Sequence, residues 1–326
     1  MTAQLNWALL STARITRALI PPLQSSERNV LRAVASRDLA TAEAFAAKNG
    51  IPQAYGSYEA LLADPAIDVI YVPLPNHLHA EWSIKALRAG KHVLCEKPLA
   101  LTLGEVDAMT AAARQSGRVL MEAFMYRHNA QTLKIEALVA SGAIGQVRLI
   151  RGAFSFTLQS DVNVRLVRAY GGGSLWDVGC YPVSYSRLLA GAPVVEAYGQ
   201  QVCGRGGVDE VFAGTLRFAN GVLAQFDCGF ALPGRAFMEI IGSEGTLTIP
   251  EPYKPAPVNR VTLTRGGETE TIEISGGELY AGEVENLADA ILLGAEPRVS
   301  LADSRANVAA LLALYRSAES GAPIGL

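Results

Sequence analysis

Apolar runs alternate with helical patterns in the first part of the chain. The runs are NWALL, NVLRAVAS, IDVIYVPLP, KHVLCEKP and RVLMEAF, which begin at residues 6, 29, 67, 91 and 118. Short apolar runs of this kind are typical of buried strands, and the segments between them end at glycines such as Gly50 and Gly90, as helices often do. Strand and helix in alternation predict a doubly wound parallel sheet of the Rossmann type.

The pattern changes after residue 145, where strand-like runs follow one another directly. They are joined by dipeptides such as Asn220-Gly221 and Gly266-Gly267, which favour hairpin turns. A mainly antiparallel open sheet is therefore expected. Helical patterns interrupt or follow it at residues 174–190, 281–292 and 301–318.

A chain of 326 residues is long for one hydrophobic core. We predict an α/β protein with a dinucleotide-binding Rossmann domain over residues 1–123 and an α+β domain over residues 124–326. The second domain is expected to bind substrate and to form oligomer contacts, and the C-terminal helix to pack back on the first. Residues 214–230 contain more apolar side chains than one wetted sheet face needs, which predicts a homodimer or homotetramer through this sheet.

Composition excludes several classes of protein. Half of the residues are hydrophobic, 18% are charged and the net charge is −3, so a nucleic-acid or membrane partner is not expected. The N-terminus lacks the features of a signal peptide and no apolar run is long enough to span a bilayer. The four cysteines form no C-x-x-C pair and the four histidines have no metal-binding spacing. We therefore predict a cytoplasmic protein with reduced thiols and no metal site.

The loop after the first run stands where a dinucleotide-binding enzyme carries G-x-G-x-x-G, but Ser11, Ala13 and Thr16 occupy the three glycine positions. Main-chain N–H groups at the helix N-terminus bind the phosphates, so small residues can replace glycine. Thr12 adds a hydroxyl donor. A plain strand entering a helix is the alternative interpretation.

The second run ends in VASRD, which places Ser36 and Arg37 at the ribose-binding position. NAD-specific enzymes hold the ribose 2′-hydroxyl with a carboxylate there, whereas a hydroxyl and a guanidinium suit a 2′-phosphate. Asp38 comes one residue too late for the carboxylate. The residues favour NADP(H), with NAD(H) possible, unless Arg37 is only a solvated surface charge.

Two further stretches have residues suited to proton transfer. In CEKPL, Lys97 follows the strand predicted from the run that begins at residue 91, at the edge where open α/β sheets bind ligands; an ion pair with Glu96 is the simpler interpretation. In GGGSLWDVGCYP, the glycines allow close approach of a ligand, and Asp177 and Tyr181 share one face if the segment is helical. A tyrosine beside Lys97 would have a lowered pKa and could exchange a proton with a hydroxyl or carbonyl group. Packing at a domain interface is the alternative for Tyr181.

The stretch PLPNHLH ends the run that begins at residue 67. Asn76 is predicted to cap the following helix, whose N-terminus faces the same crevice, and His79 lies in its first turn. A cofactor contact is expected of His79 rather than proton transfer.

Together these stretches resemble the Gfo/Idh/MocA oxidoreductases over essentially the full chain. The resemblance rests on LSTARI, VASRD, PLPNHLH, CEKPL, EAFMYR, GGGSLWDVGCYP and VSLADSRANVAALLALYRSAESG. Lys97 matches the lysine of the family's E-K-P motif, and Tyr181 the last position of D-x-G-x-[YH]. With tyrosine at that position, the sequence resembles the branch of the family that includes glucose–fructose oxidoreductase, dimeric dihydrodiol dehydrogenase and NADP-dependent xylose dehydrogenase. That branch often has L-x-T-A-R-I after the first strand, so Ser11 is a modest departure.

The resemblance implies hydride transfer between nicotinamide and a carbon that has a hydroxyl or carbonyl group, usually on a sugar or related polyol or diol. Tyr181 would exchange the proton, Lys97 would tune its pKa, and Asp177 would anchor substrate hydroxyls or the other two side chains. Tyr126 and Arg127 would line the crevice. The implied cofactor contacts are Ser11, Thr12, Ala13, Arg14, Ile15, Ser36, Arg37, Leu74, Pro75, Asn76, His79, Glu96, Lys97, Arg165 and Trp176.

Two alternative functions remain open. One is a non-catalytic regulator that senses a nucleotide with the same fold, against which the presence of both Lys97 and Tyr181 argues. The other is an NAD-dependent glycosidase, which would favour a carboxylate in place of Ser36 and Arg37 and would release no net reduced cofactor.

Overall fold

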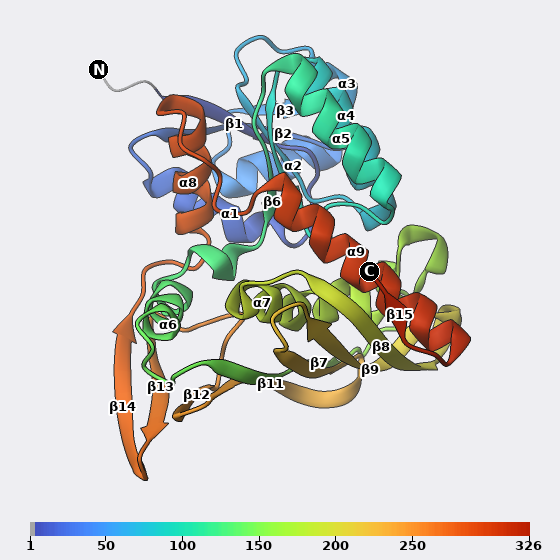
Figure 1. The fold of residues 1–326 in the computed structure, drawn as a ribbon. Coiled ribbons are helices and arrows are strands. Elements are labelled where there is room, and N and C mark those ends of the chain that lie inside the picture. Colours follow the sequence, from blue (N-terminus) through green and yellow to red (C-terminus); the bar gives the residue numbers. More distant parts are fainter. Residues whose placement is uncertain (1–3) are drawn as a thin grey trace. The chain divides into compact units, whose positions relative to one another are not determined.

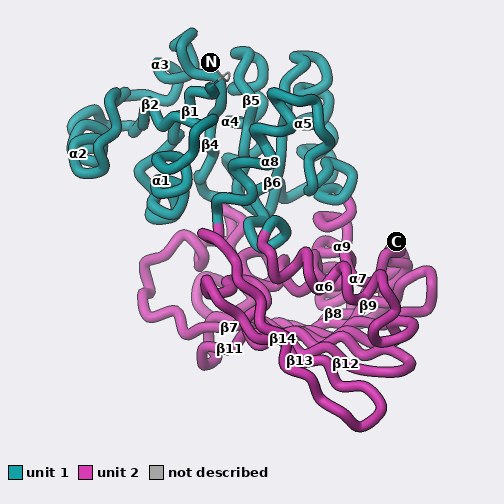
Figure 2. The backbone as a smooth tube through the Cα atoms, turned by 90° about the vertical axis from the view of Figure 1, so that its left-hand side faces the viewer, with its two compact units in different colours: residues 1–128, 280–305 teal, residues 129–279, 306–326 magenta. Residues whose placement is uncertain are grey.

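A computed structural model describes residues 4–326 of the chain. The chain divides into two compact units, coloured separately in Figure 2. One unit comprises residues 1–128 and 280–305, and the other comprises residues 129–279 and 306–326. Each unit therefore contains segments that are far apart in the sequence.

The first unit is built on a six-stranded parallel sheet (Figure 1). The strands lie in the order β3-β2-β1-β4-β5-β6, which is the strand order of the Rossmann fold. The two strands at the centre of the sheet are almost entirely buried, so each consists mainly of apolar residues. Their bounds are β1 (Leu5–Leu9), β2 (Asn29–Ala35), β3 (Gln53–Tyr55), β4 (Val69–Val72), β5 (His92–Glu96) and β6 (Leu120–Ala123).

Helices connect these strands. They are α1 (Thr16–Ser25), α2 (Leu39–Asn49), α3 (Tyr58–Leu62), α4 (His79–Arg88) and α5 (Leu103–Ser116). The predicted capping of α4 by Asn76 is wrong, because Asn76 begins a separate 3₁₀ turn and Leu78 is the residue that precedes α4. The turn inserts three residues between the strand end and the helix, which moves the helix start to His79.

Helix α8 (Ala281–Leu292) belongs to the first unit, although the sequence pattern assigned it to the second. Arg28, just before β2, explains this assignment because its guanidinium pairs with Glu285 at 2.5 Å and with Asp289 at 2.7 Å. The side chain of Asn29 also donates to Glu285, at 3.1 Å. The expected boundary at residue 123 therefore differs from that of the structure, where the first unit extends to residue 128 and resumes at residue 280.

The second unit contains a nine-stranded sheet with the order β14-β13-β12-β11-β7-β10-β9-β8-β15. Only β7 and β10 pair in parallel, so the sheet is mainly antiparallel as predicted. Its strands are β7 (Val147–Thr157), β8 (Val194–Cys203), β9 (Asp209–Phe218), β10 (Leu223–Gly229), β11 (Ala231–Gly242), β12 (Gly245–Ile249), β13 (Val258–Arg265), β14 (Glu268–Ser275) and β15 (Ile324–Gly325).

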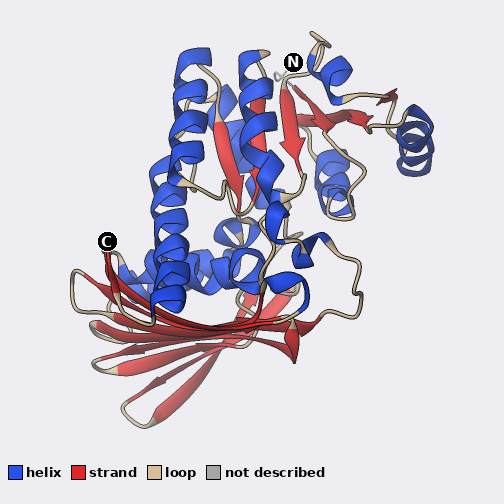
Figure 3. Cartoon of the chain, turned by 90° about the vertical axis from the view of Figure 1, so that its right-hand side faces the viewer, coloured by secondary structure: helices blue, strands red, loops and turns tan. Residues whose placement is uncertain are grey.

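Helices cover one face of this sheet (Figures 1 and 3). They are α6 (Ala130–Ala140), α7 (Cys180–Ala190) and the later part of α9 (Leu301–Ser320). Apolar side chains of the strands, such as Leu216, Ala224 and Phe226, are buried on this side. The hydrophobic core of the second unit therefore lies between the sheet and its helices.

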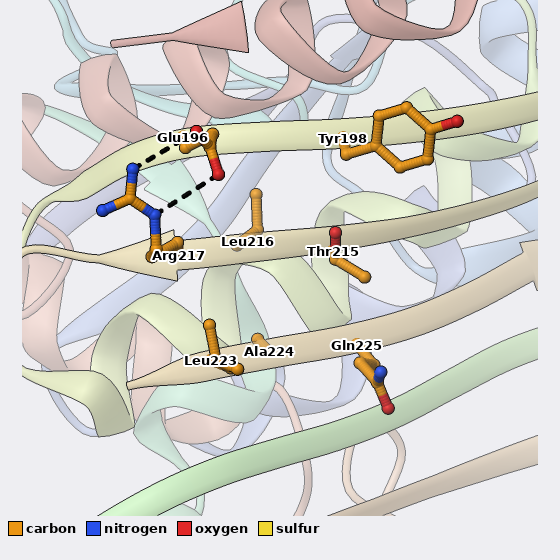
Figure 4. Close-up of a pocket in the computed structure, with 8 residues that line it drawn as sticks. All are labelled: Glu196, Tyr198, Thr215, Leu216, Arg217, Leu223, Ala224 and Gln225. Carbon is orange, nitrogen blue, oxygen red and sulfur yellow. Dashed lines mark hydrogen bonds and ion pairs between the residues drawn. The ribbon is translucent and has the colours of Figure 1, made fainter. Parts of the chain in front are cut away.

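The opposite face of the sheet is mixed in character, as Figure 4 shows for β8, β9 and β10. Residues on it include an ion pair of Arg217 with Glu196 at 3.2 Å, together with Tyr198, Thr215 and Leu223, around a hollow of about 200 Å³. The expected excess of apolar residues on this face is wrong, because the apolar residues of β9 and β10 alternate toward the helices. Oligomerisation through this face stays a prediction.

Several smaller expectations can be compared with the structure. All four cysteines are free thiols, and only Cys203 is exposed. Among residues 4–326, no group of three metal-ligating side chains is gathered. None of the helices in this part of the chain has both the length and the apolar character needed to cross a bilayer. The cytoplasmic location stays a prediction.

Candidate active site

The loop between β1 and α1 lies at the carboxyl end of β1, whose neighbours in the sheet are β2 and β4. This is the point at which strand order reverses and where open α/β sheets bind ligands. The hydroxyl of Ser11 accepts a hydrogen bond from the main-chain N–H of Ala13 at 3.0 Å, and the N–H and hydroxyl of Thr16 both donate to the carbonyl of Ala13. No non-glycine residue of the described chain has a positive φ. Ser11 thus replaces glycine without backbone strain.

The same loop has main-chain donors available for an anion. Within residues 4–326, the N–H groups of Thr12, Arg14 and Ile15 donate to no protein acceptor. Helix α1 has no side-chain cap at its N-terminus. N–H groups at a helix N-terminus favour a phosphate group, so the loop fits the pyrophosphate of a dinucleotide.

The end of β2 gives Asp38 and Arg37 different roles. Asp38 is the N-cap of α2 and accepts hydrogen bonds from the N–H of Thr41 at 2.8 Å and from its hydroxyl at 2.5 Å, which lower the pKa of this carboxyl group. Arg37 is exposed and pairs with no carboxylate of the described chain. The main-chain N–H of Ser36 donates a hydrogen bond to the carbonyl oxygen of Tyr55. A free guanidinium without a competing carboxylate suits a phosphate ligand.

The loop that includes Lys97 is held on two sides. Glu122, a buried residue of β6, accepts a hydrogen bond from the N–H of Leu99 at 2.8 Å. Glu96 accepts one from the hydroxyl of the buried Tyr71 at 2.5 Å, and also from the N–H of Lys97 at 3.3 Å. Glu122 and Tyr71 were not singled out from the sequence. The signal in the sequence was a carboxylate, Glu122, in the otherwise apolar run LMEAF.

His79 is fully buried beside this loop. Its two ring nitrogens lie 2.8 Å from the carbonyl oxygens of Leu74 and Pro98. Both nitrogens are thus engaged inside the first unit, and the cofactor contact of His79 stays a prediction. His79 joins the loop after β4, where Leu74, Pro75 and Asn76 lie, to the turn after Lys97.

The second unit holds the other candidate residues on an unusual helix. Residues Leu175–Gly179 form a π-helix that continues directly into α7. Asp177 therefore lies on the π-helix and Tyr181 on α7, rather than on one face of a single α-helix as predicted. Short π-helical segments occur frequently at functional sites.

Specific contacts hold each of these side chains. Arg165 pairs with Asp177 at 2.6 Å, and the aspartate side chain is only 16% exposed. Tyr181 is 4% exposed and packs edge-on against Phe154, with ring centroids 5.3 Å apart. Trp176 is buried and lies 5.5 Å from the ring of Tyr315 on α9. The structure thus brings Arg165 to Asp177 and places Trp176 against another aromatic ring.

The glycines before the π-helix approach the chain itself. A Cβ atom on Gly172 would lie 2.5 Å from the carbonyl oxygen of Arg165, and one on Gly173 would lie 2.1 Å from a carboxylate oxygen of Asp209. The sequence was interpreted to mean that these glycines make room for a ligand. In the structure, Gly172 and Gly173 make room for neighbouring parts of the chain itself. Asp209 is a further residue that sequence reasoning missed, because a lone acidic residue at a strand start is usually exposed.

Comparison with known protein families adds information on the whole chain. Residues 5–124 match the model described as "Oxidoreductase family, NAD-binding Rossmann fold", and residues 132–248 match that described as "GFO/IDH/MocA C-terminal domain". Both matches fall on the parts of the chain that contain the loops described above.

Individual relatives match nearly end to end. A D-xylose 1-dehydrogenase (NADP(+)) from Haloferax volcanii is 38% identical over 98% of this chain and 99% of its own. A trans-1,2-dihydrobenzene-1,2-diol dehydrogenase from Danio rerio is 39% identical over 76% of this chain and 74% of its own.

Solved structures give the same result for the fold. The aldose-aldose oxidoreductase of Caulobacter crescentus, crystallised with glycerol, matches with a TM-score of 0.93 and 28% identity, covering 99% of this chain and 100% of that one. The 3-ketoreductase KijD10 of Actinomadura kijaniata, in complex with NADP and TDP-benzene, matches with a TM-score of 0.91 and 30% identity, covering 96% of this chain and 98% of that one.

Proposed function

Because this chain belongs to the GFO/IDH/MocA oxidoreductase family, we propose that it is an NADP(H)-dependent enzyme acting on a hydroxyl or carbonyl carbon of a sugar, polyol or diol. The observation that carries this proposal is the turn after β1, which leaves the N–H groups of Thr12, Arg14 and Ile15 without protein acceptors at the strand-order reversal. NADP(H), when bound, supplies or accepts the hydride.

The choice of NADP(H) over NAD(H) rests on the end of β2. Asp38 is committed to the N-terminus of α2, so no carboxylate of VASRD is left for the ribose 2′-hydroxyl. Arg37 is exposed and has no ion-pair partner in the described chain, so its guanidinium can bind a 2′-phosphate. The names of the Haloferax volcanii dehydrogenase and of the KijD10 complex both include NADP, which supports this choice.

Proton transfer is assigned to side chains of both units. As the family resemblance implies, Tyr181 gives a proton to, or takes it from, the substrate oxygen, and Lys97 takes part in the same proton transfer. Asp177, held by Arg165, accepts hydrogen bonds from substrate hydroxyls. KijD10 has also been crystallised with a lysine replaced and with a tyrosine replaced, and these two residues are separated by the same number of positions as Lys97 and Tyr181.

The remaining proposed cofactor contacts come from four places. The loop after β1 contributes residues 11–15, and the loop after β4 contributes Leu74, Pro75 and Asn76, with His79 supporting that loop from behind. Glu96 orients the Lys97 turn. Arg165 and Trp176 are proposed to lie near the nicotinamide, which is an expectation from the family.

A panel of aldoses, polyols and trans-diols, each offered with NADP⁺ and with NAD⁺ and followed at the nicotinamide absorbance, tests the proposal. We expect net reduction of NADP⁺ with at least one sugar or diol. Tight NADP(H) binding without turnover of any substrate would favour a nucleotide-sensing regulator instead. Release of sugar from a glycoside without net reduction would favour a glycosidase.

A further inference from the structure

Asp209 is the first residue of β9 and is only 2% exposed. One of its carboxylate oxygens accepts hydrogen bonds from the hydroxyl of Ser174 at 2.7 Å and from the main-chain N–H of Leu175 at 2.8 Å. The other oxygen accepts one from the hydroxyl of Tyr315 on α9 at 2.8 Å. A single buried carboxylate thus joins three separate elements of the second unit.

The position of these contacts along the chain is significant. Leu175 is the first residue of the π-helix, so its N–H is one of the helical donors that lack a partner inside the helix. The π-helix has no side-chain cap of its own. Asp209 supplies the missing acceptor from a distant strand. Asp177 follows two residues later, and Tyr181 is the second residue of α7.

Packing around the carboxylate leaves little freedom. Gly173 has a φ of +122°, and a Cβ atom there would lie 2.1 Å from Asp209 and 2.8 Å from the hydroxyl of Tyr315. The ring of Tyr315 also packs against Trp176, inside the π-helix. Burial raises the pKa of Asp209, whereas its three hydrogen-bond donors act in the opposite direction. Because the main-chain N–H can only donate, the ionised carboxylate matches this set of partners best.

We propose that Asp209 is a positioning residue, which fixes the start of the π-helix and thereby the orientation of Asp177 and Tyr181. This inference rests on the proposed function, since it assigns the two positioned side chains to substrate. Asp209 acts through charge-assisted hydrogen bonds to Leu175 and Ser174, and Tyr315 holds the carboxylate from the other side. Small displacements of reacting groups are costly in rate, so loss of this anchor should be visible in turnover.

Two variants test the proposal at different strengths. Asp209→Asn keeps the shape but removes the charge, and Tyr315→Phe removes a single hydrogen bond. We expect Asp209→Asn to lower kcat by about 10- to 100-fold, with an altered pH profile of kcat. The dissociation constant of NADP(H) should stay within about twofold of the wild type, since the loops proposed to bind its pyrophosphate and 2′-phosphate belong to the first unit, and Arg165 and Trp176 are the only contacts proposed from the second. Tyr315→Phe should show the same changes in weaker form.

Asp227→Asn is the matched control, because Asp227 lies on the neighbouring strand β10 and pairs with the half-exposed Arg235 at 2.7 Å. It should leave kcat and its pH profile unchanged. If Asp209→Asn and Tyr315→Phe lower only the unfolding midpoint and leave the pH profile of kcat as in the wild type, Asp209 is merely structural and the proposal is overturned.

Hydrogen exchange gives a second measurement that needs no substrate. In both variants, amides of residues 174–181 should exchange about tenfold faster than in the wild type, while those of the first unit do not change. Unchanged exchange in this segment would overturn the proposal even if no substrate had been found. Failure of the proposed function is seen separately, as retained turnover in Tyr181→Phe.

Discussion

The Nδ1 atom of His79 lies 2.8 Å from the carbonyl oxygen of Pro98, one residue beyond Lys97. Its Nε2 atom lies equally close to the carbonyl oxygen of Leu74, 2.8 Å away. A neutral imidazole has one N–H, so it can donate to only one of these two acceptors at a time. Burial is the main cause that lowers the pKa of His79 to about 4.

Replacing His79 with leucine should destabilise the first unit. The substitution removes the one hydrogen bond that the neutral ring donates to these carbonyl groups, and a buried polar group that loses its hydrogen bond costs about 1–3 kcal/mol. Urea unfolding followed by tryptophan fluorescence measures the loss. Arg88→Gln on the same helix is the control, because this exposed side chain makes no ion pair with the described residues and should contribute very little. Equal unfolding midpoints for the wild type and His79→Leu would contradict this role.

Acid should destabilise the protein before its carboxylates begin to titrate. The pKa values of His79 and His92 are lowered to about 4 and that of His128 to about 3, chiefly by burial. The unfolded chain takes up these protons near pH 6.5, whereas the folded chain does not, so stability is complete above that pH and decreases as the pH falls. For each such histidine, the free energy of unfolding should decrease by up to about 1.4 kcal/mol for each pH unit below this value.

Urea midpoints measured between pH 7.5 and pH 5 provide the test. They should decrease steadily below about pH 6.5. A constant midpoint over this interval would mean that the three rings titrate with the same pKa values in the folded chain as in the unfolded chain.

Replacing Arg37 with alanine should weaken binding of NADP(H) by about 1–3 kcal/mol, the usual range for a hydrogen bond to a charged group. Binding of NAD(H) should hardly change, because the 2′-phosphate is the group that Arg37 contacts in our proposal. Titration with each reduced nucleotide, followed by its fluorescence, measures both affinities. Arg32→Ala, an exposed arginine within strand β2, is the control, since Arg37 follows the same strand. An equal loss of affinity for both nucleotides would contradict the assignment of Arg37 to the 2′-phosphate.

Lys97→Ala and Tyr181→Phe should each lower kcat by roughly 10²- to 10⁴-fold, as expected for a lost general acid or base. If the two side chains act on the same proton, the double variant should cost far less than the product of the two single effects. Binding of NADP(H) should survive Tyr181→Phe, because only the hydroxyl is removed. Steady-state kinetics on the best substrate of the panel decides this, and near-normal turnover of Tyr181→Phe would show that the tyrosine is structural.

Sedimentation velocity at micromolar concentration tests oligomer formation through the exposed face of the nine-stranded sheet. We expect a particle of two or four chains, each of 34.6 kDa. Leu223→Glu, which puts a charge on the hollow lined by Tyr198 and Thr215, should shift the particle toward the monomer. A wild-type protein that sediments as a monomer would exclude this interface.

The sequence predicted the sheet of the first unit well because its central strands are almost entirely buried. A run such as the four residues of β4, all buried, stands out without any tertiary information. The family was also identifiable, because Lys97 and Tyr181 lie in motifs that are short and in a fixed order.

Prediction was poorer where a side chain depends on a distant partner. The anchoring of Leu175 by Asp209 joins residues far apart in the sequence, and no local pattern indicates it. The same holds for the π-helix, which the sequence pattern could not distinguish from the start of an α-helix. In β9 and β10, counting apolar residues without assigning them to alternate faces gave the wrong character for the exposed face.

The ion pairs between Arg28 and α8 also have a consequence for how the protein is made. Residues 280–305 complete a unit whose other residues are synthesised first. Arg28 can therefore form its ion pairs with Glu285 and Asp289 only after most of the chain has been synthesised. Contacts of such long sequence separation slow folding, so the nascent nucleotide-binding unit stays incomplete during most of translation. A chain that ends before residue 280 should accumulate as a partly folded species rather than as an independent domain.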